Sequence, residues 1–588
     1  MFMLQPRNTI TITFKKQYIE PPHKISTLKC WRSKRMRIDV MKTLEQAYQE
    51  FDYEALIKQQ LVGNPHSINA YVECCGRYVG SNKIALIWEG KNGKSEQWTF
   101  DQLAESSGQL ANYFNAIGLK TGDCIAGLLP RTPELLITIL ATWRIGAIYQ
   151  PLFTAFESKA IEHRISTAQT KLIVTHTEQR SKLNDLNNIH LLTVSVDESR
   201  DSFEANFWQE IDKYPSEFEP VMQTFEDDFL MMFTSGTTGL AKSVRVPHKA
   251  ILAFKEYMRL AVDLREEDSF WNLADPGWAY GLYYGITGPL ALGHRIIMDE
   301  RNFSVDHAVA VIKKYQVSNL TGSPTAFRMF FGFKEKFDVS IKTHLRAVSS
   351  AGEPLTPEVI HWFNQDLNVN IYDQYGQTEL GMVIANHHAL EHPKKVGSAG
   401  FANPGHRFCV LNAEHQEVEK GGIGTLAIDF SQSPLVWFKG YGGNNRKSFV
   451  GHYYLTGDTV KLNELEGVDF IGRDDDVITM SGYRVGPFDV ESTLLECAEV
   501  LESAVIGKPD PERTEVVKAF VVLKPQFSSS VKLGLKLQEY VRSRLSKHAY
   551  PKEIEFVDAL PKTSSGKIQR NLLKQQEIAK MEQLKHIS

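Results

Sequence analysis

The chain has 588 residues, of which 42% are hydrophobic and 23% are charged, and its net charge is -4 at neutral pH. A single hydrophobic core stops growing at about 250–300 residues, so this length predicts at least two domains. The near-neutral charge gives no support to nucleic-acid binding. No run of the sequence approaches the ~18 consecutive apolar residues of a membrane-spanning helix.

The first 40 residues are much more basic than the rest of the chain. They carry nine lysines and arginines against two acids, Glu20 and Asp39. Such a segment is compatible with an organelle transit peptide, with a disordered arm, or with a true start of translation at Met36 or Met41. The six cysteines are scattered and form no CxxC pair, which is typical of a reducing compartment. We therefore expect a cytoplasmic protein, with an organelle matrix as the alternative if residues 1–40 are a transit peptide.

From about residue 83 to about residue 430, short apolar runs alternate with amphipathic stretches. The predicted strands are Lys83–Trp88, Cys124–Leu129 and Leu172–Thr175, and the predicted helices are Phe100–Ile117, opened by Asp101, and Pro133–Ile145. Strands that alternate with helices of about 10–15 residues indicate βαβ units and a parallel sheet covered on both faces. The expected fold class is therefore α/β, with a large, multi-lobed N-terminal domain of mostly parallel sheets flanked by helices.

A change of composition near residue 473 predicts a domain boundary. The run Gly472–Asp476 contains three consecutive aspartates, whose mutual repulsion favours an exposed linker. After it, the predicted helices are Val490–Leu501 and Leu533–Leu545, and the predicted strands are Ser503–Ile506 and Ala519–Leu523. We therefore expect a basic arm at 1–40, a large domain at 41–474 and a small α+β domain at 475–588.

A loop rich in glycine and hydroxyl groups follows the strand predicted at Phe229–Phe233. Its residues suited to phosphate contacts are Thr234, Ser235, Gly236, Thr237, Thr238, Gly239 and Lys242. Glycines let backbone N–H groups approach phosphate oxygens, hydroxyls add donors, and the lysine supplies charge. The loop is not a Walker A motif, in which the second glycine directly precedes the lysine. Taken alone, these residues are equally compatible with a polar surface turn.

Further motifs follow this loop in order along the chain. They are Ala274–Gly281, Ser349–Leu355, Asp373–Glu379, Tyr454–Asp458, Gly472–Arg473, Ser481–Arg484 and Leu560–Ile568. In this order the set resembles the adenylate-forming superfamily of acyl-CoA synthetases, adenylation domains and luciferases, over roughly residues 45–575. Within the superfamily the chain looks most like the medium-chain acyl-CoA synthetases. The resemblance implies an acid–thiol ligase that uses ATP, Mg²⁺, coenzyme A and a small carboxylic acid.

The resemblance assigns the nucleotide to residues of the large domain. Thr234–Lys242 would hold the ATP phosphates, and Gly352, Glu353 and Pro354 would contact the adenine. The adenine and the α-phosphate would lie beside Asp373, Gln374, Tyr375, Gly376, Gln377 and Thr378. Asp458 and Arg473 would bind the ribose, and Glu379 would bind the Mg²⁺ ion. Lys567 resembles the lysine that enters the site for adenylation only. Cations at this point stabilise the charge that develops when a carboxylate attacks the α-phosphorus. Without the resemblance, a lysine in such a polar loop would be solvated and idle.

The same resemblance implies that the small domain rotates about Asp475 between two half-reactions. The rotation would withdraw Lys567 and present residues to coenzyme A. Those residues are Gly482, Tyr483 and Arg484, with Arg513 and Tyr550 as further candidates. Lys567 also matches a lysine that relatives regulate by acetylation, which would neutralise its charge and stop adenylation.

The sequence departs from the family pattern at three informative positions. Ala241 and Ser243 replace the proline and glycine that usually flank the loop lysine, and both are small, so we expect altered loop stiffness rather than lost binding. Gly376 stands where acetate-specific relatives place a tryptophan, so we expect an open acyl pocket that favours a medium-chain or aromatic acid. Trp278 is the candidate for lining that pocket, and core packing is its alternative role.

Three hypotheses for function remain at this point. The first is an acyl-CoA synthetase that forms an acyl-adenylate and then the thioester, releasing AMP and pyrophosphate. The second is an adenylating enzyme that loads a carrier protein, although no carrier domain is fused to this chain. The third is an inactive nucleotide-binding scaffold, against which the intact Lys567, Asp458, Arg473 and Glu379 argue.

Overall fold

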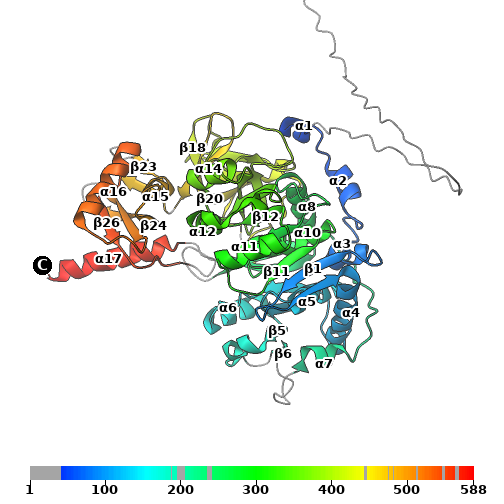
Figure 1. The fold of residues 1–588 in the computed structure, drawn as a ribbon. Coiled ribbons are helices and arrows are strands. Elements are labelled where there is room, and N and C mark those ends of the chain that lie inside the picture. The colour runs from blue at the N-terminus through cyan, green and yellow to red at the C-terminus, as the bar shows by residue number, and fades with distance from the viewer. Residues whose placement is uncertain are drawn as a thin grey trace, which may run out of the picture. The chain divides into compact units, whose positions relative to one another are not determined.

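The computed structural model describes residues 41–186, 189–194, 205–234, 241–442, 446–474, 476–480, 483–510, 514–545, 550–562 and 568–587. The predicted N-terminal arm, residues 1–40, lies outside this part of the chain. Within the described residues the strands form five sheets (Figure 1). The fold is α/β, with a large N-terminal part that contains two mostly parallel sheets and a smaller C-terminal part, as the sequence predicts.

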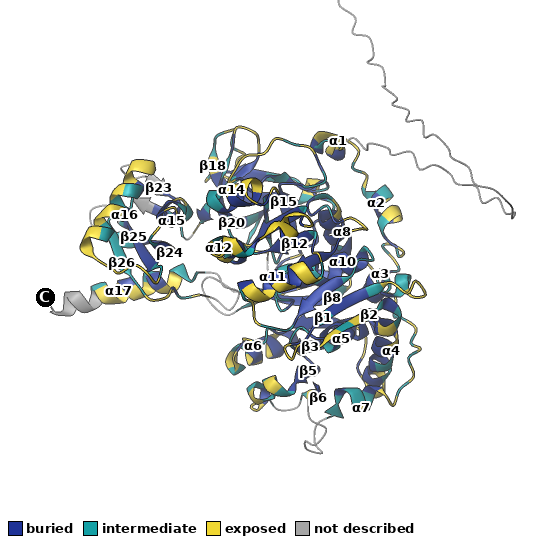
Figure 2. Ribbon diagram, viewed as in Figure 1, coloured by how far each residue is buried: buried dark blue, intermediate teal, exposed yellow. Residues whose placement is uncertain are grey.

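The largest sheet has seven strands in the order β7-β6-β5-β3-β4-β8-β9. Their bounds are β3 Cys124–Leu128, β4 Ile148–Pro151, β5 Leu172–His176, β6 His190–Val194, β7 Ala205–Asn206, β8 Asp228–Thr234 and β9 Lys242–Pro247. All neighbours pair in parallel except β8 and β9. Strands β3, β4 and β5 are buried along their whole length, which is typical of a parallel sheet covered on both faces (Figure 2).

The second large sheet has six strands in the order β10-β12-β13-β14-β15-β16. Their bounds are β10 Phe270–Asn272, β12 Asn319–Gly322, β13 Ala347–Ala351, β14 Asn370–Gln377, β15 Gly381–Ala385 and β16 Phe401–Ala402. The strands β10, β12, β13 and β14 are parallel, because helices connect them, whereas β15 and β16 are added by antiparallel pairing.

Helices cover these sheets and connect their strands. In the large part they are α1 Leu44–Gln49, α2 Tyr53–Gln60, α3 Ala70–Cys74, α4 Phe100–Ala116, α5 Pro133–Arg144, α6 Ser158–Ala168, α7 Phe207–Ile211, α8 Ala250–Leu260, α9 Ala279–Leu282, α10 Gly288–Ala291, α11 Val305–Lys314, α12 Pro324–Gly332, α13 Val339–Lys342 and α14 Pro357–Gln365. Short 3₁₀ turns are η1 Gly76–Tyr78, η2 Thr177–Leu183, η4 Lys334–Lys336 and η5 Phe430–Gln432, and η3 Tyr283–Thr287 is a π-helix. In the described part of the chain, no helix is both long and apolar enough to span a membrane.

The start of α4 corrects one detail of the sequence prediction. Thr99, not Asp101, caps this helix: its hydroxyl accepts from the N–H of Gln102 at 3.1 Å, and the Gln102 side chain accepts from the N–H of Thr99 at 2.9 Å. This reciprocal capping box satisfies two backbone donors at once. Asp101 lies in the first turn, where its charge favours the positive end of the helix.

The region after β14 contradicts the predicted alternation of strands and helices up to residue 430. Two smaller sheets complete the large part, with strand orders β11-β1-β2 and β17-β18-β20-β19, and β21 pairs with β20. Their bounds are β1 Ile84–Glu89, β2 Ser95–Thr99, β11 Ile296–Asp299, β17 Phe408–Leu411, β18 Ile423–Asp429, β19 Phe449–Val450, β20 Tyr453–Leu462 and β21 Val468–Arg473. Between Gly381 and Arg473 every described strand pair is antiparallel, because short connections replace the crossover helices that parallel strands need.

The C-terminal sheet has the strand order β23-β22-β25-β24, with β26 beside β25. The bounds of its strands and helices are β22 Ile478–Met480, β23 Tyr483–Val485, β24 Val500–Asp510, β25 Thr514–Leu523, β26 Glu553–Phe556, α15 Pro487–Leu495, α16 Val531–Arg544 and α17 Arg570–Ile587. The predicted helix Val490–Leu501 is wrong at its end: α15 stops at Leu495, because Val500 pairs with Leu523 and starts β24. Pro487 at the first helical position explains the earlier start.

Candidate active site

The predicted phosphate loop connects two antiparallel strands, β8 and β9, at the edge of the seven-stranded sheet. Thr234 and Lys242 pair directly across the base of this connection. Since β8 runs parallel to β4, the loop leaves the carboxyl end of the parallel strands, where α/β sheets bind their ligands. Five predicted phosphate contacts between these two residues lie outside the described residues: Ser235, Gly236, Thr237, Thr238 and Gly239.

Lys242 and the predicted magnesium ligand Glu379 both contact Tyr441. The Nζ atom of Lys242 is 4.8 Å from the centre of the Tyr441 ring, and the Tyr441 hydroxyl donates to Glu379 Oε1 at 2.5 Å. Glu379 is only 6% exposed, and burial raises the pKa of Tyr441, so this hydroxyl stays a donor. Proteins usually bind Mg²⁺ with one or two carboxylates together with the phosphates of a substrate, so the Glu379 carboxylate fits that ion.

The predicted adenine residues are tied to β14 by a buried carboxylate. Asp373 accepts hydrogen bonds from the N–H of Leu355 and from the N–H of Gln374, each at 3.1 Å. Burial raises the pKa of Asp373 to about 7. Gly352 has a φ of +106°, and a Cβ built there would meet nothing within 4 Å. The positive φ favours glycine at this exposed position, and the adenine role of Gly352 stays a prediction.

The other predicted residues of these two segments are held by the large domain. Arg328 donates to Glu353 at 2.8 Å, so the Glu353 carboxylate is ion-paired. Pro354 is half-buried beside it. The carbonyl of Thr378 accepts from the Tyr283 hydroxyl at 3.1 Å, which anchors the turn after β14.

The predicted ribose carboxylate, Asp458, is the point where three separate motifs meet. The hydroxyl of Tyr375 and the Nε2 atom of Gln377 both donate to Asp458 Oδ2, the latter at 2.9 Å, and Arg473 Nη1 lies 3.2 Å from Oδ1. Asp458 and Arg473 also face each other across β20 and β21. The side chain is almost fully buried, and burial raises its pKa although Arg473 lowers it. The structure thus brings Tyr375, Gln377, Asp458 and Arg473 into contact, and their assigned roles at the nucleotide stay predictions.

Two other predicted residues of β14 serve the scaffold. The side chain of Gln374 is buried, donates to Ser349 Oγ at 3.1 Å and accepts from the Tyr257 hydroxyl. Gly376 lies at a bulge against β15, and a Cβ added there would be 2.2 Å from the carbonyl oxygen of Gly381. Any side chain at this position would displace β15, which is a reason for glycine in addition to an open pocket.

Trp278 lies in an aromatic cluster next to an unusual helix. Its ring centroid is 5.5 Å from those of Phe153 and Phe156, and its buried indole N–H has no hydrogen-bond partner among the described residues. Two residues later Tyr280 contacts the Tyr257 hydroxyl at 3.2 Å, and the π-helix η3 follows. Single π-turns occur often at functional sites. Core packing explains the ring contacts of Trp278, and its role in an acyl pocket stays a prediction.

A family model described as AMP-binding enzyme matches residues 77–441, which is more than half of the chain. The chain belongs to the AMP-binding enzyme family. A second model, the AMP-binding enzyme C-terminal domain, matches residues 489–567. Among curated relatives of this AMP-binding enzyme, an acetyl-coenzyme A synthetase of Bacillus subtilis is 35% identical over 92% of this chain and 96% of its own length.

Solved structures agree with this assignment. An acyl-CoA synthetase of Brucella canis is 50% identical, with a TM-score of 0.75, over 92% of this chain and all of that chain. An ATP-bound RpMatB-BxBclM chimera is 26% identical, with a TM-score of 0.77, over 87% of this chain and 99% of that one. The curated and structural relatives place this AMP-binding enzyme among the acyl-CoA synthetases and ligases.

The C-terminal residues predicted for this AMP-binding enzyme are less completely described. Asp475, Gly482, Arg513 and Lys567 lie outside the described residues, as do the side chains of Tyr483 and Arg484 on β23. Tyr550 is described, and it lies in basic surroundings. The Nζ atom of Lys552 is 3.8 Å from the centre of its ring and donates to its hydroxyl, and the Arg542 guanidinium is 5.8 Å from the ring.

Two residues of the site are missing from the sequence prediction. Tyr441 positions Glu379 and contacts Lys242, and Tyr257 donates to the side chain of Gln374 on β14. Both contacts join residues far apart in the chain, so no local spacing indicates them. The aromatic run Trp437–Tyr441 is the available signal for the first.

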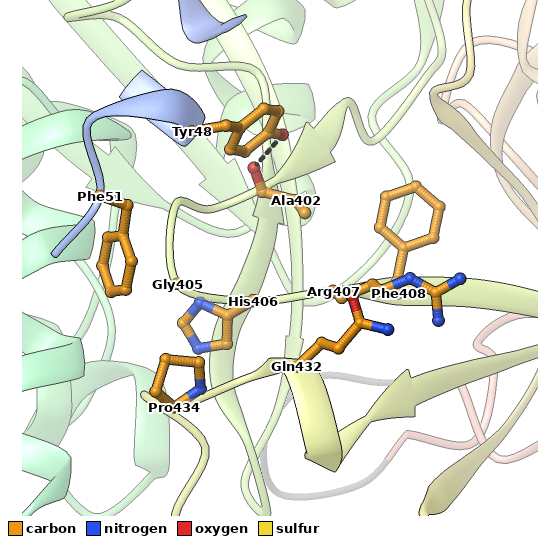
Figure 3. A pocket seen from close by; sticks show the side chains of 9 residues that line it. All are labelled: Tyr48, Phe51, Ala402, Gly405, His406, Arg407, Phe408, Gln432 and Pro434. Carbon is orange, nitrogen blue, oxygen red and sulfur yellow. Dashed lines mark hydrogen bonds between the residues drawn. The ribbon is translucent and has the colours of Figure 1, made fainter. Parts of the chain in front are cut away.

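A surface cavity of about 430 Å³ is separate from the predicted site (Figure 3). It is lined by Tyr48, Phe51, Ala402, Gly405, His406, Arg407, Phe408, Gln432 and Pro434, none of which is a predicted site residue. The Tyr48 hydroxyl donates to the carbonyl of Ala402 at 2.7 Å, which holds α1 against β16. Burial lowers the pKa of His406 to about 4, so this ring is neutral at physiological pH.

Proposed function

We propose that this AMP-binding enzyme is an acyl-CoA synthetase that converts a medium-chain or aromatic carboxylic acid, ATP and coenzyme A into acyl-CoA, AMP and pyrophosphate. The observation that carries the proposal is the buried Asp458 carboxylate, on which Tyr375, Gln377 and Arg473 converge. A fixed carboxylate of this kind pairs well with two vicinal ribose hydroxyls. The acetyl-coenzyme A synthetase and acyl-CoA synthetase relatives support the same reaction class.

The chemistry of the first half-reaction follows from the placement of charge. The substrate carboxylate is the nucleophile, so no side-chain nucleophile is needed. Lys242 would bind phosphate oxygens at the base of the β8–β9 loop, and Lys567 would neutralise charge at the α-phosphate. Glu379, oriented by Tyr441, would hold Mg²⁺, which supplies further neutralisation of the phosphates when bound.

The choice of acid depends on the space beside Gly376. A glycine leaves no ring to close the acyl pocket, and the contact with Gly381 leaves no room for one in this backbone. We therefore propose an acid longer than acetate, with Trp278 on the wall of the pocket. Acetate is the second candidate, because a relative at 35% identity is an acetyl-coenzyme A synthetase.

For the second half-reaction we propose that the small domain rotates at Asp475 and presents coenzyme A contacts. Gly482, Tyr483, Arg484 and Arg513 are proposed contacts from the sequence. Tyr550 has additional support, since Lys552 and Arg542 surround its ring with positive charge suited to the phosphates of coenzyme A.

The test is pyrophosphate release with ATP, Mg²⁺ and acetate, butyrate, octanoate, palmitate or benzoate, each with and without coenzyme A. We expect sustained turnover that requires coenzyme A and is fastest with an acid longer than acetate. Fastest turnover with acetate would contradict the pocket proposal alone. A single burst that is indifferent to coenzyme A would indicate another acceptor, and no release with any acid would leave only nucleotide binding.

A matched pair of lysines tests the role proposed for Lys567. We expect Lys567→Ala to abolish pyrophosphate release. Lys562→Ala, which removes a nearby lysine paired with Glu502 at 2.6 Å, should leave it within about twofold, because this ion pair is exposed. Acetylation of Lys567, proposed as a regulatory modification, should reproduce the effect of Lys567→Ala.

We also propose a cytoplasmic location, with an organelle matrix as the alternative. Fusing residues 1–40 to a fluorescent reporter distinguishes the two. A diffuse cytoplasmic signal supports the first, and import with removal of the segment supports the second.

A further inference from the structure

Helix α17 begins three residues after Lys567, and its first residue makes a two-pronged ion pair. Arg570 donates from Nε to Glu491 Oε1 at 3.0 Å and from Nη2 to Glu491 Oε2 at 2.6 Å. A bidentate guanidinium–carboxylate pair fixes orientation as well as distance. Glu491 lies on α15 and is only 5% exposed, so the start of α17 is attached to the interior of the small domain.

The carboxylate of Glu491 is itself held in place. The Oε1 atom also accepts from the backbone N–H of Val505 at 2.7 Å. The backbone carbonyl oxygen of Glu491 accepts from the Ser503 hydroxyl at 3.1 Å. Val505 is fully buried in the core between α15, α16 and the sheet. Buried residues of the small-domain core therefore fix the position of Arg570.

The chain on both sides of residues 563–567 is also fixed. Ile568 forms a β-bridge with Lys562, and the N–H of Gln569 donates to the carbonyl of Pro561 at 2.9 Å. One turn into α17, Leu573 is 4% exposed and packs into a small hydrophobic cluster of this domain. Arg570 follows this bridge directly, so the bridge and the ion pair together fix the chain immediately after Lys567.

Charges from three parts of the molecule act on Arg570. Asp476 Oδ2, one residue after the proposed hinge, lies 4.0 Å from its Nη1 atom. Burial lowers the pKa of Arg570, but the carboxylates of Glu491, Asp476 and Glu353 together raise it, so the guanidinium is charged at every physiological pH. Glu353 belongs to the proposed adenine loop, so Arg570 is subject to the charges of the hinge, the small-domain core and the nucleotide site.

We infer that Arg570 is a positioning residue for adenylation: its ion pair with Glu491 fixes the start of α17, three residues after Lys567, and through this attachment point influences how Lys567 reaches the α-phosphate. The inference rests on the proposed function and adds a residue to it. Lysine cannot reproduce the two-pronged geometry, so the site requires arginine and not positive charge alone.

The test compares two ion pairs of the same helix. Arg570→Met and Arg570→Lys remove or weaken the pair with Glu491, whereas Lys574→Met removes the pair with Glu515, which is 2.6 Å long and one turn further from Lys567. Each variant is assayed for adenylate formation from acid and ATP, and separately for thioester formation from chemically synthesised acyl-adenylate and coenzyme A. Thermal unfolding is measured for all of them.

We expect Arg570→Met to lower kcat for adenylate formation on the order of 10- to 100-fold, because a misplaced catalytic group costs about this much. Its KM for ATP should change less than about threefold, and its thioester half-reaction should stay within about twofold, because Lys567 acts in the first half-reaction only. Arg570→Lys should lie between Arg570→Met and the unchanged protein. Lys574→Met should leave both half-reactions within about twofold.

Equal losses in the two half-reactions, or a loss in Lys574→Met as large as in Arg570→Met, would show a merely structural role and overturn the inference. So would full adenylation activity in Arg570→Met. Lys567→Ala separates this failure from a failure of the proposed function. If Lys567→Ala still forms adenylate, the proposed role of Lys567 is wrong; if only Lys567→Ala is inactive, the inference about Arg570 alone is wrong.

Discussion

Asp458 and Asp373 are two buried carboxylates of the same site with different surroundings. Asp458 accepts from side chains of three residues, Tyr375 and Gln377 on β14 and Arg473 on β21. Asp373 accepts only backbone N–H groups in its own segment and that of Leu355, and burial raises its pKa to about 7. Side-chain donors favour the charge of the first carboxylate, whereas the second mainly connects β14 to the segment of Leu355.

The difference separates residues that bind from residues that shape the site. Burial raises the pKa of Asp458 as well, but Arg473, Tyr375 and Gln377 oppose this rise and favour the charged form that a ribose can use. The environment of Asp373 disfavours its charge, so Asp373 acts mainly by holding the proposed adenine loop against β14. The same motif, Asp373–Glu379, therefore contains residues of both kinds, and four substitutions test the distinction.

The largest effect is expected for Asp458→Asn. The change removes the buried charge, its ion pair with Arg473 and the proposed acceptor for the ribose hydroxyls, so we expect kcat/KM for ATP to fall on the order of 10²–10³-fold, or about 3–4 kcal/mol. Initial rates of pyrophosphate release at varied ATP measure it. Asp429→Asn is the control, because Asp429 is also buried and pairs with Arg407 at 2.7 Å. The control should lose stability and keep its KM for ATP; an equal rise in KM in both variants would contradict a specific role for Asp458.

Gly376→Ala tests the close contact between β14 and β15. The added Cβ would be 2.2 Å from the Gly381 carbonyl oxygen, so β15 must shift, and we expect a loss of about 2–3 kcal/mol in the free energy of unfolding. Gly332→Ala is the control, since a Cβ there meets nothing within 4 Å and glycine weakens the helix it ends. Urea unfolding of both variants measures the difference. An unchanged stability of Gly376→Ala would show that the strand yields easily and leave only the open acyl pocket as the reason for glycine.

Asp373→Asn tests the raised pKa. Since the folded-state pKa, about 7, is above the ordinary value of 3.8, the stability that Asp373 contributes is fully present below about pH 4 and is lost as the pH rises through 7. Between pH 5 and pH 8 we therefore expect the unmodified protein to lose about 2 kcal/mol more unfolding free energy than Asp373→Asn. Urea titrations at the two pH values measure this. Parallel pH dependences in both proteins would mean that Asp373 is ionised throughout the range.

Sequence reasoning succeeded where chemistry is encoded locally. The strands β3 and β5 and the helices α4 and α5 agree with their predicted bounds to within one or two residues, because continuous apolar runs and helical periodicity are local signals. The family resemblance assigns Asp458 and Arg473 to the same ribose; the register of β20 and β21 places them opposite each other, and the ribose role itself stays a prediction.

The failures came where tertiary contacts decide the outcome. The predicted end of the helix at Leu501 missed the pairing of Val500 with Leu523, which overrides helix propensity. Gln374 and Gln377 are the same residue type in one motif, yet the first is buried against Ser349 and the second reaches Asp458. Only the packing of β14 between its neighbours distinguishes them.

The smallest effect is expected for Tyr441→Phe, a residue that no motif indicated. The substitution keeps the ring beside Lys242 and removes the hydroxyl, which donates to Glu379 and also interacts with Tyr454. The lost bond to the Glu379 carboxylate is worth about 1.5 kcal/mol, or roughly tenfold. Because the lost bond orients the proposed magnesium ligand, the Mg²⁺ concentration for half-maximal adenylation should rise by about this factor, while the KM for the acid stays constant. Tyr441→Leu removes the ring as well and should also raise the KM for ATP. If Tyr441→Phe instead lowered the rate equally at every Mg²⁺ concentration, Tyr441 would act on the fold of the segment and not on Glu379.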